Sequence, residues 1–166
     1  MRAGARGLGV LLGVALLGAG PAGAQEPGVG DSAPIVAVHD LDGASVDLGQ
    51  WIGRKPVFLE FWATWCTSCA ALDPAVRAAR ARYGSAVEFI GINITVGDAR
   101  DTVRAWVTDH APPWRVLYDD EGVSQRAYDV AATSYVVIID RSGRIAYTGV
   151  GGTQSFDAAL RRVASP

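Results

Sequence analysis

The stretch FLEFWATWCTSCAALDP, from Phe58 to Pro74, holds the only two cysteines of this 166-residue chain, Cys66 and Cys69. Two cysteines separated by two residues have three common uses in proteins. They form a structural disulfide, they supply two ligands of a metal site, or they work as a redox pair. The residues on either side of the pair favour one of these three.

An expected strand precedes the pair and an expected helix follows it. Residues 56–62 (PVFLEFW) are a nearly continuous apolar run with β-branched and aromatic members, which is typical of a strand buried on both faces. After the cysteines, apolar residues recur at helical spacing, at Leu72, Val76, Ala79 and Tyr83. Gly84 then suits the position just past a helix end.

This context predicts a reactive first cysteine. Cys66 would lie at the helix N-terminus, where unpaired N–H groups and the helix dipole favour an anion. Its thiol pKa is therefore expected to fall below the free value of ~8.5. Cys69, one turn further into the helix and more buried, would stay protonated until it resolves the mixed disulfide that Cys66 forms.

The two other uses of the pair fit less well. A disulfide across two residues closes a very small loop, which constrains the unfolded chain little. A structural zinc site needs about four ligands, and the pair supplies two. His39 and His110 could complete such a site on paper, but His39 falls in an expected hairpin and His110 on a helix face beside Trp106. A redox pair is the favoured interpretation.

The rest of the chain alternates expected strands and helices. Strands are expected at residues 35–38, 45–46, 87–94, 115–118, 135–139 and 144–148. Helices are expected at 98–110 with Asp98 as N-cap, at 122–128, and after Ser155 as the cap of a final helix. This order predicts an α/β fold with a mixed sheet covered by helices on both faces. Right-handed crossovers would bring Trp65 and Cys66 to one edge of that sheet.

The N-terminus has the pattern of a secretory signal. Arg2 and Arg6 precede a short apolar run at residues 8–19, and Ala22-Gly23-Ala24 has the small-x-small form of a cleavage site. We expect a signal peptide at 1–24, a linker at 25–30 and one domain at 31–166, with an uncleaved anchor as the alternative. Cleavage after Ala24 removes two arginines and no acid, so the net charge moves from −2 to −4.

Several motifs together resemble a known family. Phe61-Trp62-Ala63-x-Trp65-Cys66-x-x-Cys69, with Pro74 following, resembles the active site of the thioredoxin superfamily. Further upstream, GDSAP at 30–34, DLDG at 40–43 and the segment 53–57 (GRKPV) resemble the exported TlpA/ResA-like branch. The resemblance covers nearly all of the mature chain. It implies a thioredoxin-like fold with an N-terminal β-hairpin, and thiol–disulfide exchange that needs no cofactor.

The resemblance also implies roles for other residues. Glu60 lies where thioredoxins have a buried acid, so it would accept the proton of the resolving thiol of Cys69. Trp65 would cap the site and contribute to the surface on which a partner docks. Pro74 would kink the helix that starts at the cysteines.

One position departs from the family pattern. The family has a cis-proline just before the late buried strand, and this chain has Ser134 there, preceded by Thr133. We expect both residues to lie in the substrate-docking region, with hydroxyls that could stabilise a thiolate. In the family this proline also keeps metals off the dithiol. The Thr67-Ser68 pair between the cysteines lacks the proline common in reductants, which leaves the reduction potential open.

These features predict an exported, periplasmic thiol–disulfide oxidoreductase. Its partners would be the thiols and disulfides of other exported proteins and an unidentified electron donor. The family resemblance favours reduction, in cytochrome c maturation or copper-oxidase assembly. The alternative is a copper carrier that uses Cys66 and Cys69 as ligands. The balanced composition indicates no nucleic-acid partner, and no stable membrane span is expected after signal cleavage.

Overall fold

The computed structural model describes Met1 and residues 27–165. Apart from Met1, the predicted signal peptide lies outside the described residues, as do the first two residues of the predicted linker. The elements in chain order are β1 (Ala37–His39), β2 (Ser45–Asp47), the 3₁₀ turn η1 (Leu48–Gln50), β3 (Val57–Trp62), α1 (Thr67–Tyr83), β4 (Glu88–Asn93), α2 (Arg100–His110), β5 (Arg115–Tyr118), α3 (Val123–Ala127), β6 (Tyr135–Ile139), β7 (Ile145–Val150) and α4 (Asp157–Ala164).

The seven strands of the described chain form one mixed sheet, in the order β2-β1-β5-β4-β3-β6-β7. The central strands β3, β4 and β5 run parallel, and the outer pairings are antiparallel. β1 and β2 form the predicted hairpin, with Val38 opposite Val46. Because β3 and β4 are parallel and paired in register, their carboxyl ends meet at one edge of the sheet. The cysteine pair follows β3 at that edge.

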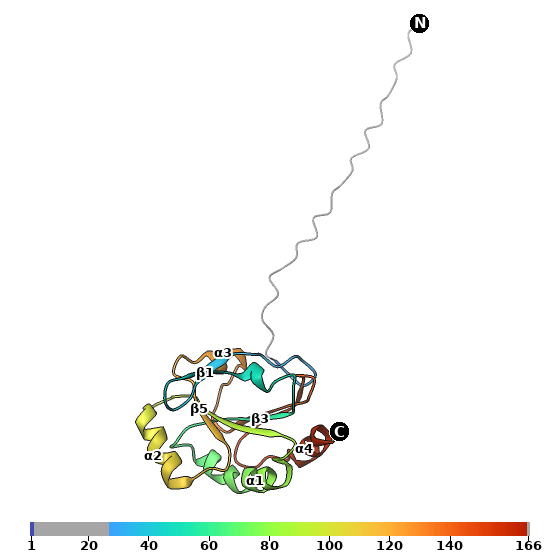
Figure 1. The fold of residues 1–166 in the computed structure, drawn as a ribbon. Coiled ribbons are helices and arrows are strands. Elements are labelled where there is room, and N and C mark those ends of the chain that lie inside the picture. Colours follow the sequence, from blue (N-terminus) through green and yellow to red (C-terminus); the bar gives the residue numbers. More distant parts are fainter. Residues whose placement is uncertain (2–26, 166) are drawn as a thin grey trace.

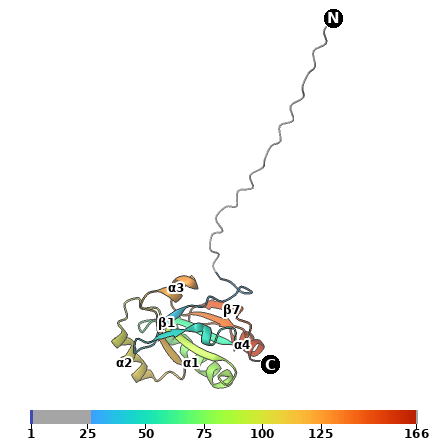
Figure 2. The same cartoon turned by 45° about the horizontal axis from the view of Figure 1, so that its top comes forward.

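Helices cover both faces of the sheet, as predicted. Figure 1 shows α1 and α4 on one side and α3 on the other, and Figure 2 shows the same layers in a turned view. Every residue of β3 is buried, and alternate side chains enter different cores. Phe58 packs with residues of α1 and α4, whereas Leu59 and Phe61 pack with Tyr128, which directly follows α3. The apolar run of the sequence is therefore explained by burial on both faces.

Two predicted helix N-caps are wrong, and the glycine predicted to follow α1 has an ordinary conformation. Asp98 does not cap α2, since the N-cap is Ala99 and makes no side-chain hydrogen bond. Gly84 does follow α1, but its φ of −67° is right-handed, so this position does not require the conformational freedom of glycine. Ser155 does not cap α4, since the N-cap is Phe156. Asp98 is used instead at the cysteine site, as described below.

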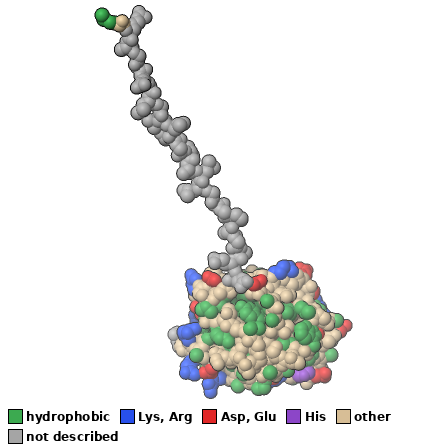
Figure 3. All heavy atoms as spheres, turned by 180° about the vertical axis from the view of Figure 1, so that it is seen from behind, with side chains coloured by type: hydrophobic (Ala, Val, Ile, Leu, Met, Phe, Trp, Pro, Cys, Tyr) green, Lys and Arg blue, Asp and Glu red, His purple; other side chains and the backbone are tan. Residues whose placement is uncertain are grey.

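The surface is of mixed character. On the face seen in Figure 3, hydrophobic side chains lie in patches separated by polar atoms, and the Lys and Arg side chains lie towards the edges of the view.

Among the helices of the described residues, none is both long enough and apolar enough to cross a membrane.

Candidate active site

The structure places Cys66 at the N-terminus of α1, as the sequence predicts. Cys66 is the N-cap residue, and its backbone carbonyl accepts the first helical hydrogen bond, from the N–H of Ala70 at 3.1 Å. Its Sγ accepts a hydrogen bond from the N–H of Cys69 at 3.0 Å. Cys66 and Cys69 are joined as a disulfide, with their Cα atoms 5.2 Å apart. A sulfur so placed is stabilised as a thiolate once the disulfide is reduced.

The burial of the two cysteines differs from the prediction. Cys69 was expected to be the more buried, yet it is 9% exposed and Cys66 is 5% exposed. Both line the same cavity beneath α1, so burial does not separate them. Ser68, one of the two residues between the cysteines, has its Oγ 3.3 Å from the Sγ of Cys66. A disulfide sulfur carries no hydrogen, so the Ser68 hydroxyl is the donor in this contact.

Asp98 fixes the loop that leads from β3 to the cysteines. Its carboxylate accepts hydrogen bonds from the N–H of Thr64 at 2.7 Å, the hydroxyl of Thr64 at 2.5 Å and the side-chain amide of Asn93 at 2.8 Å. Asp98 and Asn93 are both buried. These bonds join the carboxyl ends of β3 and β4 and hold the start of α1 in place. No pattern in the sequence connected Asp98 with Thr64.

Glu60 lies in the interior near the cysteines, on β3. The residue is 6% exposed. Burial, and secondarily the nearby charge of Asp73, raise the pKa of its carboxyl from the ordinary 4.5 to about 8. At neutral pH Glu60 is therefore mostly protonated. A group with such a pKa can exchange a proton with a cysteine thiol, whose free pKa is ~8.5, at little cost in free energy.

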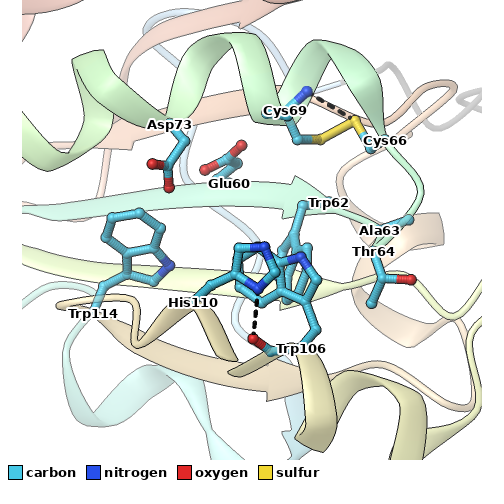
Figure 4. Close-up of a pocket in the computed structure, with 11 residues that line it drawn as sticks. Glu60, Trp62, Ala63, Thr64, Cys66, Cys69, Asp73, Trp106, His110 and Trp114 are labelled. Atoms are coloured by element: carbon cyan, nitrogen blue, oxygen red, sulfur yellow. Dashed lines mark hydrogen bonds between the residues drawn. A yellow bond between two sulfur atoms is a disulfide. The ribbon is translucent and has the colours of Figure 1, made fainter. Parts of the chain in front are cut away.

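A cavity of about 270 Å³ runs beneath the cysteine pair. Figure 4 shows Glu60 on β3 below Cys69, with the carboxyl group of Asp73 reaching the same space from α1. Two further lining residues, His110 and Trp114, come from the end of α2 and the segment just before β5. Asp73 and Trp114 approach Glu60 only once the chain is folded, so no sequence pattern connects them with the site.

Trp65 lies on the surface beside the disulfide. It is 54% exposed, and its Nε1 donates a hydrogen bond to the carbonyl of Val96 at 2.6 Å. Val96 is itself exposed, so the two side chains present apolar area next to the cysteines. This position suits the predicted docking role, which remains a prediction.

Ser134 is buried and engaged with the segment after β7. It has a left-handed φ of 59°, and the described residues contain no cis peptide bond. Its hydroxyl donates to the carbonyl of Gly151 at 3.1 Å, and its own carbonyl accepts from the N–H of Gly151 and the side-chain amide of Gln154. A Cβ on Gly152 would lie 3.1 Å from the carbonyl oxygen of Ser68. The loop that holds Ser134 thus packs against the segment that carries the cysteines. Thr133, the residue before Ser134, is half-buried.

The two histidines occupy different settings. His39 lies near the surface, with its Nδ1 2.7 Å from a carboxylate oxygen of Asp120. His110 stacks on Trp106 with ring centroids 4.2 Å apart, and its Nδ1 donates to the Trp106 carbonyl at 2.9 Å. Within residues 27–165 no group of three or more His, Cys, Asp or Glu side chains is placed to hold a metal ion.

A mixed sheet with a Cys-x-x-Cys pair at the helix that follows its central strand defines a thioredoxin-like protein. A model of the family described as Redoxin matches residues 28–160, so the chain belongs to this family. Its curated relatives include the thioredoxin-like protein YneN of Bacillus subtilis, 30% identical over 74% of this chain and 71% of that protein. The thiol-disulfide oxidoreductase ResA of the same species is 28% identical, over 81% of this chain and 74% of that protein.

Solved structures agree with this assignment. The thioredoxin domain of a Bacteroides vulgatus thiol-disulfide oxidoreductase covers 82% of this chain and 98% of its own, with a TM-score of 0.71 and 18% identity, which shows the fold. A secreted Mycobacterium tuberculosis disulfide oxidoreductase homologous to Escherichia coli DsbE is 27% identical, with a TM-score of 0.65, over 78% of this chain and 94% of its own. The protein is a thiol–disulfide oxidoreductase of the ResA/DsbE type.

Proposed function

We propose that the protein acts outside the cytoplasm as a reductant of disulfides in other exported proteins. The observation that carries the proposal is the cysteine pair at the N-terminus of α1 above the buried Glu60. The resemblance to the TlpA/ResA-like branch supports reduction, with apocytochrome c thiols or the copper-site cysteines of an oxidase assembly protein as substrates. One structural relative is itself described as secreted, which supports export.

The exchange proceeds in two displacements. The Cys66 thiolate attacks one sulfur of the partner's disulfide, forms a mixed disulfide and releases the partner's other sulfur as a thiolate. The Cys69 thiol then gives its proton to Glu60 in its ionised form, which is the minor form at neutral pH, and attacks the Sγ of Cys66, which releases the second partner sulfur. Two electrons pass to the partner, whose thiolates take up protons, and the Cys66–Cys69 disulfide forms. An external donor must return two electrons before the next turnover.

A trapping experiment tests the exchange. A Cys69→Ala variant keeps the attacking sulfur but cannot resolve the mixed disulfide, so covalent complexes with exported proteins should accumulate in cells. The matched Cys66→Ala variant removes the attacking sulfur and should yield few or none. Absence of complexes with Cys69→Ala would refute the proposed role of Cys66.

The direction of exchange is tested by redox equilibration of the protein against glutathione. A reductant should have a potential near or below that of thioredoxin, about −270 mV, whereas a value near that of DsbA, about −120 mV, would show an oxidant. Ser68 and the N–H of Cys69 both donate to the Cys66 sulfur, so they contribute to this value.

Export is tested by sequencing the N-terminus of the protein recovered from the periplasm of the cells that produce it. Cleavage after Ala24 predicts a mature chain that begins at Gln25. A chain that begins at Met1 and sediments with membranes would instead support the uncleaved anchor. In the copper-carrier alternative, Cys66 and Cys69 are themselves the ligands, as soft thiolates suit Cu(I).

A further inference from the structure

In the exchange proposed above, Glu60 must pass protons to and from the solvent, yet it is buried. Its carboxyl is mostly protonated at neutral pH, so it must lose that proton before it can accept the proton of Cys69. Glu60 is 6% exposed and lines the cavity beneath α1. The reaction therefore needs a route by which a proton passes from this cavity to bulk water.

The cavity supplies the inner part of such a route. Its volume of about 270 Å³ has room for several water molecules, each of which occupies ~30 Å³ in the liquid. Polar side chains from three places line it, namely Glu60 on β3, Asp73 on α1 and His110 at the end of α2. Water among these groups can carry a proton away from Glu60. The question is which of the other two side chains exchanges that proton with the solvent.

Asp73 is poorly suited to take up the proton. The Nε of Arg77 lies 2.6 Å from its carboxylate. The same guanidinium donates to the backbone carbonyl of His110 at 3.0 Å and lies over the ring of Trp114, so it is held in place. A proton on Asp73 would remove one charge of this ion pair. Asp73 thus acts as a fixed negative charge beside Glu60 rather than as a carrier of protons.

His110 has the geometry of a proton carrier. The residue is exposed to solvent, and its side chain also lines the cavity. Its ring stacks on that of Trp106 with 7° between the ring planes, and its Nδ1 donates to the Trp106 carbonyl at 2.9 Å. These contacts fix the ring and keep the proton of the neutral imidazole on Nδ1, so Nε2 carries a lone pair. In Figure 4 the bond to Trp106 leaves the ring on the side away from Glu60.

Imidazole is the side chain that both takes up and releases protons near neutral pH. The Nε2 of His110 can accept a proton that arrives through the cavity and release it to bulk water, which leaves the ring as it began. We propose that His110 relays protons between Glu60 and the solvent during thiol–disulfide exchange. It is a positioning residue and not a catalytic one, because it acts on the sulfurs only through Glu60.

The charged groups around His110 come from three elements. Glu60 on β3 and Asp73 on α1 share the cavity with it, as do the two cysteines. Arg77 on α1 contacts its backbone carbonyl, and Asp109 is the exposed residue before it on α2. Arg77 is paired with Asp73, so its positive charge is balanced when an imidazolium forms during the relay.

The inference rests on the exchange mechanism proposed above, and one assay separates the two. The reduced protein is mixed in a stopped-flow instrument with dithiobis(nitrobenzoate), an aromatic disulfide whose thiolate product absorbs visible light. A first thiolate is released when Cys66 attacks the probe, in a phase whose rate grows with probe concentration. A second is released when Cys69 gives its proton to Glu60 and attacks the Sγ of Cys66, in a phase whose rate does not depend on probe concentration.

In weakly buffered solution at pH 7, His110→Gln and His110→Phe should slow the second phase about tenfold and leave the first unchanged. Added imidazole should return the second phase to within about twofold of the wild-type rate, because a free base takes over the relay. The wild type should not respond to imidazole. His39→Gln is the matched control, since His39 lies in the hairpin and pairs with Asp120, and it should leave both phases unchanged.

A second phase as fast in both His110 variants as in the wild type would overturn the relay and leave the exchange activity intact. A slow second phase that imidazole does not restore would overturn it too, because His110 would then have only a structural role. Absence of the second phase in the wild type would overturn the exchange mechanism itself, and the relay with it. If His110→Phe does not fold, the rates of His110→Gln with and without imidazole decide the outcome.

Discussion

Glu60→Gln should make the protein more stable at neutral and alkaline pH. The folded protein holds a proton on Glu60 up to about pH 8, whereas an ordinary glutamate loses it near 4.5. The contribution of Glu60 to stability is therefore fully present below pH 4.5 and is lost as the pH rises to about 8. Glutamine has nearly the same shape and never ionises, so the variant avoids this loss.

The size of the effect follows from the two pKa values. Each pH unit between them changes the free energy of unfolding by 1.36 kcal/mol, so the complete loss is roughly 5 kcal/mol. At pH 7 the loss is about 3 kcal/mol, since Glu60 is still mostly protonated there. The free energy of unfolding of Glu60→Gln minus that of the wild type should thus be about 3 kcal/mol larger at pH 7 than at pH 4.5. The difference should level off above pH 8.

Urea unfolding of the oxidised proteins, followed by tryptophan fluorescence from pH 4.5 to 9, measures this difference directly. Groups that titrate in both proteins cancel, so the comparison isolates Glu60. Glu88→Gln is the matched control, because Glu88 is a half-buried strand glutamate that pairs with Lys55 at 2.5 Å, away from the cysteines. It should not reproduce the increase. If the Glu60→Gln difference changes by less than about 1 kcal/mol between pH 4.5 and 8, the raised pKa of Glu60 is refuted.

Three further substitutions test, by urea unfolding, the residues that hold the active site in place. Asp98→Ala should lower the free energy of unfolding by about 3 kcal/mol, because Thr64 and Asn93 lose a buried charged acceptor. Ser134→Pro should lower it by about 3 kcal/mol or more, since the φ of 59° is closed to proline, which requires about −65°. Leu72→Ala should cost about 2–5 kcal/mol, as the Leu72 side chain is fully buried in the core under α1.

The first two of these substitutions have a control and a contrary outcome. Asp101→Ala removes an exposed carboxylate from the same part of the chain and should change stability by less than about 1 kcal/mol. Equal effects of Asp98→Ala and Asp101→Ala would contradict the anchoring role of Asp98. Glycine readily adopts the left-handed backbone conformation of this position. Ser134→Gly should therefore lower the free energy of unfolding far less than Ser134→Pro does. A Ser134→Pro variant as stable as the wild type would show that this backbone can adopt another conformation.

The strand, the helix and the cysteine pair between them were predictable because local rules determine them. The run at 56–62 has the composition of a strand buried on both faces, and the spacing from Leu72 to Tyr83 matches the buried face of α1. Asp98 was misassigned because an aspartate before a helix normally caps it. Here the half-buried Thr64 and the buried Asn93, which meet Asp98 only in the folded chain, donate hydrogen bonds to its carboxylate instead.

The cavity could not be predicted from the sequence. Glu60, Asp73 and Trp114 lie on three separate segments, and their meeting depends on strand register and on how α1 and α2 pack over the sheet. The Ser68 hydroxyl contacts the sulfur of Cys66, and the Ser134 hydroxyl donates to the carbonyl of Gly151.

Three features that oppose stability lie near the cysteines. Glu60 is a buried acid with a raised pKa, Trp62 keeps an unpaired donor, and Ser134 holds a left-handed backbone. Glu60 and Trp62 lie two residues apart on β3, so they share one face and reach one cavity. A strand selected only for folding would carry apolar side chains at both positions, as it does at Phe58. Glu60 on this face has instead the proton chemistry that the exchange reaction needs.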